Sequence, residues 1–169
     1  MKTIKNKSIL GLIILTILIG AGCKKEGCTD SNADNYDSKA DKSNSSCVYR
    51  YPSAVKINSI PEFNPSGGTW DIDGNPDVYM RFTKSTANNW IYTTAIENDF
   101  SNTVTFTITD APDYFTKEEW KYEILDFDLL SGDELISSGT FNPLSSGSNG
   151  KFTVVNGNTN IEFQYAVKE

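Results

Sequence analysis

Apolar and polar residues alternate along much of the chain from residue 54 onward, with the two-residue period of half-buried β-strands. The alternation is cleanest over 78–82, 104–108 and 161–167. Glycine, asparagine, aspartate and serine separate the runs, as is typical of turns. The pattern predicts eight strands, at 54–60, 77–83, 89–96, 102–109, 120–126, 134–141, 151–155 and 159–167. Eight short strands joined by turns predict an all-β fold over residues 51–169, an antiparallel eight-stranded Greek-key β-sandwich.

The first 22 residues have the layout of a secretory signal. Three lysines precede an apolar run over 9–19 that is too short to span a bilayer comfortably. Small residues and then Cys23 follow, an ending that resembles a bacterial lipobox, with Gly20 where an aliphatic residue is usual. The resemblance implies cleavage before Cys23 and acylation of that cysteine, with palmitate as one acyl chain, so that 23–27 form a lipidated N-terminus. An uncleaved anchor is the alternative.

The three cysteines and the net charge fit an exported protein. If Cys23 carries lipid, Cys28 and Cys47 remain as a pair in a compartment that permits disulfides. Loss of the signal removes three lysines and no acids, so the formal net charge moves from -7 to -10. Electrostatics then disfavour nucleic acid and anionic lipid headgroups as partners and favour cations.

Residues 28–50 are rich in turn-forming and acidic residues and show no apolar periodicity. They resemble a short repeat of secreted Bacteroidetes proteins that begins Gly-Cys-Thr-Asp, here at 27–30, and ends Ser-Cys-x-Tyr, here at 46–49. The resemblance implies a small N-terminal knob closed by a disulfide between Cys28 and Cys47. Its aspartates either hold a cation or are solvated surface charge: Asp30, Asp34, Asp37 and Asp41.

Two acidic clusters adjoin predicted strands. The first lies in WDIDGNPDVY, at 70–79, and contains Asp71, Asp73 and Asp77. It is no EF-hand loop, because the sixth and twelfth places counted from Asp71 hold Pro76 and Phe82 instead of glycine and glutamate. The cluster is therefore either an acidic turn or part of a site completed elsewhere in the chain.

The second cluster lies in LDFDLLSGDELI, at 125–136. Asp126 and Asp128 follow one predicted strand, and Asp133 and Glu134 open the next. Carboxylates at two adjacent loops of a rigid sandwich can converge to supply the six to eight oxygens that calcium takes. Without a cation they would repel one another and bind protons more tightly. The alternative is a pair of solvated acidic turns that keep the ends of the sheets soluble.

Together the two clusters resemble the calcium-binding loops of the C2 domain. That family places aspartates six positions apart before one strand, as Asp71 and Asp77 are, and later an Asp-aromatic-Asp run with an acidic pair, as at 126–128 and 133–134. The resemblance covers about 54–167, although Val78 replaces a common proline. It implies a C2-like sandwich and a Ca2+ site. The implied side-chain ligands are Asp71, Asp77, Asp126, Asp128 and Glu134, with Asp73 and Asp133 as outer or optional ones.

In the C2 family, bound calcium lets the loop tips dock on phospholipid, which implies a membrane or partner contact for Leu129 and Leu130. Packing of the two leucines against a neighbouring loop is the alternative. Burying both would contribute about 3–6 kcal/mol at most, which supports reversible binding only.

The functional expectation is a lipoprotein whose calcium-binding module engages an envelope component, lipid or protein through its acidic loops. Lys24 directly after Cys23 favours the outer membrane, by resemblance to Gram-negative sorting patterns. The alternative is a structural surface or spacer lipoprotein, in which calcium only rigidifies the loops or no metal binds at all.

The sequence predicts no enzyme. It contains no histidine, its remaining cysteines are best explained as a disulfide, and no serine lies in a nucleophile-elbow context. Pairs of carboxylates could in principle serve a glycosidase, but the edge of a sandwich offers no evident substrate groove. The sequence does not predict the oligomeric state.

Overall fold

The structure is a computed structural model of the chain, in which residues 24–71, 74–129, 132–145 and 147–169 are described. The predicted signal at 1–22 and the predicted acylation site Cys23 lie outside the described residues, as do Asp73 and Leu130. The described ranges contain ten strands and no helix that is long and apolar enough to cross a membrane.

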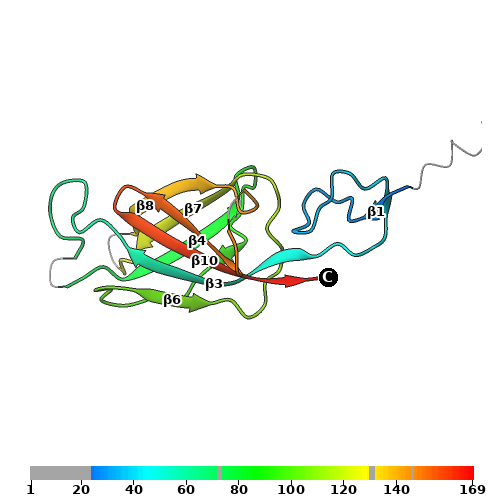
Figure 1. Cartoon of the computed structure of the whole chain (residues 1–169). Helices are drawn as coiled ribbons and strands as arrows, with labels where there is room; N and C mark the ends of the chain where they lie inside the picture. Colours follow the sequence, from blue (N-terminus) through cyan, green and yellow to red (C-terminus); the bar gives the residue numbers. More distant parts are fainter. Residues whose placement is uncertain (1–23, 72–73, 130–131, 146) are drawn as a thin grey trace, which may run out of the picture.

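Two four-stranded antiparallel sheets form the main body (Figure 1). The first sheet has the order β6-β3-β10-β9 and comprises Val104–Thr107, Tyr49–Ser59, Thr159–Lys168 and Lys151–Asn156. The second has the order β5-β4-β7-β8 and comprises Tyr92–Thr93, Val78–Lys84, Trp120–Asp126 and Glu134–Phe141. The predicted eight-stranded antiparallel sandwich is confirmed.

The connections cross repeatedly between the sheets. After β4 and β5 in the second sheet, the chain returns to the first sheet, where β6 pairs with β3. A fourth strand that returns beside the first is the Greek-key arrangement. The last strand, β10, pairs with β3 on its other side, so β3 lies inside its sheet.

Three of the predicted strands differ from the observed ones by two or more residues at an end, and one of them, predicted at 102–109, is shortened to Val104–Thr107. The predicted strand at 89–96 shrinks to two residues, Tyr92–Thr93, and the half-buried Trp90 before it lies under the Arg81 guanidinium, 4.7 Å from its ring centroid. The first strand of the sandwich starts at Tyr49 instead of residue 54. Pro52 is tolerated there because β6 pairs with β3 only over 54–57, leaving Pro52 with one neighbouring strand.

Aromatic rings from both sheets fill the core. Phe82 of β4 packs edge-on against Phe163 of β10 at 5.3 Å between ring centroids, and Phe141 of β8 stacks on Phe163 at 4.6 Å. Trp120 and Phe115 complete the cluster, and both are fully buried. Truncating such a ring to alanine costs about 3–5 kcal/mol, so the core forms a rigid support for the loops at each end.

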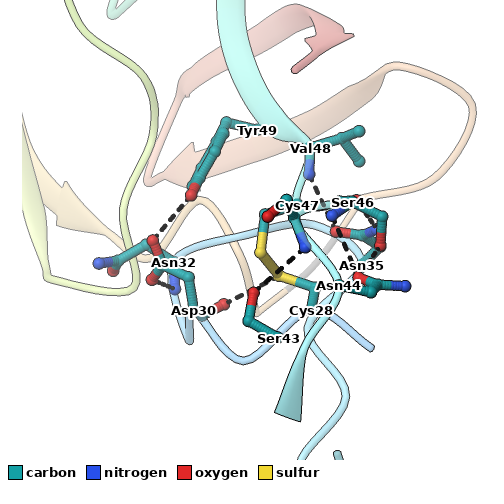
Figure 2. The surroundings of a disulfide bond; sticks show 11 residues. Cys28, Asp30, Asn32, Asn35, Ser43, Asn44, Ser46, Cys47, Val48 and Tyr49 are labelled. Atoms are coloured by element: carbon teal, nitrogen blue, oxygen red, sulfur yellow. Dashed lines mark hydrogen bonds between the residues drawn. A yellow bond between two sulfur atoms is a disulfide. The ribbon is translucent and has the colours of Figure 1, made fainter. Parts of the chain in front are cut away.

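A small knob precedes β3 and lies at one end of the sandwich (Figure 1). Within it, β1 (Glu26–Gly27) pairs in parallel with β2 (Lys42–Ser43). The predicted disulfide is confirmed: Cys28 and Cys47 are bonded, with 4.9 Å between their Cα atoms (Figure 2). Closing a loop of this size stabilises the fold by about 3 kcal/mol in the chain-entropy model.

The knob is fixed to the sandwich by side-chain bonds. Tyr49 donates its hydroxyl to Asp30 Oδ2 at 2.8 Å (Figure 2), and Arg50 Nε donates to Asp34 Oδ1 at 2.6 Å. Lys117, in the connection between β6 and β7, donates from Nζ to Ser31 Oγ at 2.8 Å. The knob is therefore held in one orientation against the start of β3.

The knob aspartates are engaged within the protein itself. Asp37 pairs with Lys25 at 2.5 Å, and the Asp41 carboxylate accepts the Lys25 backbone N–H at 3.3 Å. The backbone N–H of Asn32 and then the Tyr49 hydroxyl lower the pKa of Asp30. Of the two interpretations of these acids, the structure favours surface carboxylates with protein partners over cation ligands.

Candidate metal site at the loop end of the sandwich

The predicted metal ligands lie at the end of the sandwich that is farthest from the knob. Strand β3 begins beside the knob and runs for 11 residues, about 36 Å at roughly 3.3 Å per residue. The connection 60–77 then carries the first acidic cluster. Because Asp126 at the end of β7 pairs with Val78 and with Glu134, both clusters lie at this same end. We call it the loop end (Figure 1).

Asp126 is the most constrained acid at the loop end. Its side chain is fully buried, and its Oδ1 accepts the backbone N–H of Asp77 at 2.8 Å. Its Oδ2 is buried, and no described residue forms a hydrogen bond with it. Burial, followed by repulsion from Asp71, Asp128 and Asp77, raises the pKa of Asp126 to about 6. An unpartnered buried carboxylate oxygen is costly, at about 1–3 kcal/mol or more, unless a cation or a proton satisfies it.

The Asp71 carboxyl is repelled by carboxylates of the same group as those around Asp126. Burial, and then repulsion from Asp77, Asp128, Asp99 and Glu134 in that order, raises the pKa of the Asp71 carboxyl. All five predicted side-chain ligands therefore belong to one electrostatic neighbourhood, although they come from two separate connections.

Asp99 is an additional acid at this site that the sequence analysis did not identify. Its backbone N–H donates to Asp77 Oδ1 at 2.9 Å, and its φ of 52° places it in the left-handed region. Gly74 passes so close that a Cβ there would lie 2.8 Å from Asp99 Oδ1. A signal was available in the sequence: Asp99 lies in the turn between the predicted strands at 89–96 and 102–109, and antiparallel pairing brings that turn to the loop end.

Asp133 is hydrogen-bonded to a neighbouring side chain, whereas Leu129 is exposed. The Tyr79 hydroxyl donates to Asp133 Oδ2 at 2.5 Å, and burial, with this carboxylate, raises the pKa of Tyr79 to about 12. One oxygen of Asp133 is thus already engaged. Leu129 is 84% exposed and does not pack against a neighbouring loop among the described residues. Other exposed large apolar side chains at the loop end are Phe63, Ile96 and Leu135.

The carboxylates do not form a closed metal shell in this conformation. Within the described parts of the chain, no three Asp, Glu, Cys or His side chains are close enough together to hold a metal ion. Two observations nevertheless fit calcium: the donors are carboxylate oxygens, which calcium prefers, and Asp126 Oδ2 lacks a partner. A calcium ion here would require the loops to bring the other acids toward Asp126.

No protein-family model and no curated protein matches the chain. Solved structures are similar to it in fold. One is human GIVD cytosolic phospholipase A2 with methyl γ-linolenyl fluorophosphonate inhibitor and terbium chloride, at 15% identity and a TM-score of 0.46. The match covers 69% of this chain but 17% of the phospholipase chain, so this chain spans a small part of that enzyme.

Isolated C2 domains are also among the similar structures. One C2 domain matches at 15% identity and a TM-score of 0.41, covering 72% of this chain and 96% of that domain. A C2 domain of plant Extended Synaptotagmin 1 matches at 12% identity and a TM-score of 0.38, covering 69% of this chain and 95% of that domain. With TM-scores below 0.5, these matches support no statement about ligands or activity.

Proposed function

We propose that this chain is an exported, lipid-anchored, non-enzymatic binding module that takes calcium at the loop end and uses that end to engage a partner. The observation that supports this most strongly is the fully buried Asp126, whose Oδ2 has no hydrogen-bond partner among the described residues while neighbouring carboxylates repel it. A divalent cation would bind the unpartnered oxygen and offset the repulsion between the carboxylates.

The calcium ligands in this proposal are Asp71, Asp77, Asp126, Asp128 and Glu134, with Asp133 held by Tyr79 in an outer position. Calcium supplies positive charge that offsets the repulsion among these acids. Asp126 is the fixed point, because Asp77 already binds its Oδ1 through a backbone N–H. The remaining acids lie in or beside connecting loops, which adapt more readily than strands to a flexible coordination geometry.

The position of the proposed anchor bears on the kind of partner. Cys23 directly precedes the knob, whereas the acidic clusters follow the far end of β3. Acyl chains at Cys23 would therefore hold the knob near the membrane, with the loop end about 36 Å or more beyond it at the usual strand rise. This arrangement favours a partner outside the anchoring bilayer, which the exposed Leu129 could contact.

Calorimetric titration of the chain with calcium tests the metal site. Calcium should bind in the range up to about millimolar that is usual for extracellular modules, and Asp126→Asn with Asp128→Asn should abolish the binding heat. Asp110→Asn with Glu118→Gln is the matched control, because it removes the same charge from exposed positions in the connection before β7. Unchanged binding in the Asp126 and Asp128 double variant would refute the assignment.

A second function, a rigid surface spacer, is favoured by the way the knob is fixed to the sandwich. Arg50 joins Asp34 of the knob to the Pro143 carbonyl and lies over the Tyr165 ring at 4.6 Å. In this case calcium would raise the melting temperature without recruiting a partner. Calcium-dependent capture of an envelope component in a pull-down with the anchored chain would reject this second function.

A further inference from the structure

Two hollows flank Trp70 at the loop end. The first, of about 310 Å³, has an apolar floor that includes Trp70, Pro76 and Phe100, and a rim that includes Asn75 and Asn102. The second, of about 270 Å³, is lined by Asn64, Pro65, Ser66, Trp70, Glu134 and Leu135. Because the half-buried Trp70 borders both, the hollows form neighbouring depressions separated by one indole.

The lining of the hollows suits a ligand with many hydroxyl groups. Amide side chains such as Asn75 and Asn102 both donate and accept hydrogen bonds, as hydroxyl groups do. The apolar floor matches the C–H faces that a sugar ring presents between its hydroxyls. Pockets with an apolar floor and a few directional polar groups are typical of small-molecule sites.

The charge around the hollows selects against anions. Glu62 lines the first hollow and Glu134 the second, and Asp71 directly follows Trp70. None of the described residues that line either hollow is a lysine or arginine. An anionic ligand would meet repulsion from Glu62, which is not among the proposed calcium ligands and keeps its charge when calcium is bound, whereas a neutral polyol would not.

The hollows share a wall with the acidic clusters. The Trp70 indole N–H donates to the Pro61 carbonyl at 2.8 Å and so holds the ring in place. The Phe100 backbone N–H donates to the Pro76 carbonyl at 2.8 Å. The chain neighbours of these two residues are also joined, because the Asp99 N–H donates to Asp77 Oδ1. The segments that form the wall are therefore the segments that carry the acids.

We propose that Trp70 and the hollows on either side of it form a binding site for a neutral glycan, and that calcium at the acidic clusters strengthens this binding by ordering their shared wall. The inference rests on the proposed function, since it identifies the class of partner that the loop end engages. Other partner classes, such as a lipid surface or a protein, become outcomes of the test.

The test is a glycan microarray that carries neutral and anionic oligosaccharides. It is probed with the full-length chain in a sugar-free polyoxyethylene detergent, with chelator and with about millimolar calcium. The primary variant is Asn75→Ala with Asn102→Ala, because both side chains are exposed and their loss should not affect folding. The control is Asn88→Ala with Asn89→Ala, which removes two exposed amides from the connection between β4 and β5.

The expected result is binding to at least one neutral glycan in calcium, at least tenfold weaker in chelator and in the Asn75 and Asn102 variant, and unchanged in the control. No binding to any neutral glycan, or binding only to anionic ones, overturns the inference. Equal glycan binding in calcium and chelator overturns the coupling to calcium. Calcium titration of the same sample separates the two proposals, because a calcium heat without glycan binding refutes the glycan site alone.

Discussion

At the scale of single residues, Asp126 is the side chain on which the metal proposal depends. It is an acid that the fold buries completely, and one of its oxygens has no hydrogen-bond partner in the described part of the chain. The sequence predicted Asp126 as a ligand from its place in an Asp-aromatic-Asp run. It could not predict the missing partner, because that depends on how strands β4, β7 and β8 enclose the side chain.

Asp126→Asn should stabilise the metal-free protein, although most substitutions of buried residues destabilise. The amide can keep the acceptor for the Asp77 N–H and removes the negative charge that burial and the neighbouring carboxylates disfavour. We expect a gain of about 1–3 kcal/mol at pH 7 in chelator, the range of one buried unsatisfied group. Denaturant unfolding measures the gain; a loss of stability would show that the Asp126 charge is already satisfied without metal.

The pH dependence of the metal-free chain follows from the raised pKa of Asp126. Its pKa is about 6 in the fold against an ordinary value of 3.8, so between these values the folded state binds the proton more tightly. Stability from this group is therefore greatest below pH 4 and falls by about 3 kcal/mol as the pH rises through 6. The difference in melting temperature between the wild type and Asp126→Asn, measured in chelator, should widen from pH 4 to pH 7. A melting-temperature difference that stays constant from pH 4 to pH 7 would contradict the raised pKa of Asp126.

At the scale of elements, alternation predicted most strands because each buries one face in a common core. It failed for β5, where Trp90 packs outside under Arg81 and the strand that pairs with β4 is only Tyr92–Thr93, followed by an isolated bridge between Glu97 and Val78. It also missed Phe115, which is fully buried although it comes from an irregular connection. Contacts between segments that are distant in the sequence fix the positions of Trp90 and Phe115. The local alternation of apolar and polar residues carries no information about such contacts.

The Cys28–Cys47 disulfide contributes more to the stability of the knob than to the stability of the sandwich. Replacing both Cys28 and Cys47 by serine removes about 3 kcal/mol in the chain-entropy model, and the knob has few buried apolar residues of its own, Cys28 and Ala33. We expect amide exchange within 24–48 to quicken about a hundredfold, since 1.4 kcal/mol is a factor of ten. Amides of β7 are the internal control, and equal acceleration there would mean that knob and sandwich unfold as one unit.

At the scale of the whole molecule, the functional features lie at the two ends of one long strand. The knob, with the predicted acylation site just before it, adjoins the start of β3, and the acidic clusters and hollows follow its end. The sequence placed both acidic clusters in turns, and antiparallel pairing then brought them to one end. The two hollows required the folded chain, because they arise where three connections meet.

The most direct test of the proposed calcium site is a thermal melt of the chain, first in chelator and then in calcium. At a calcium concentration about 100 times the dissociation constant, binding stabilises the fold by about 2.7 kcal/mol. A chain of this size should then melt about 5–10 °C higher. We expect this rise in the wild type and in the Asp110→Asn, Glu118→Gln control, and no rise in the Asp126→Asn, Asp128→Asn variant. No rise in the wild type up to several millimolar calcium would contradict the metal site.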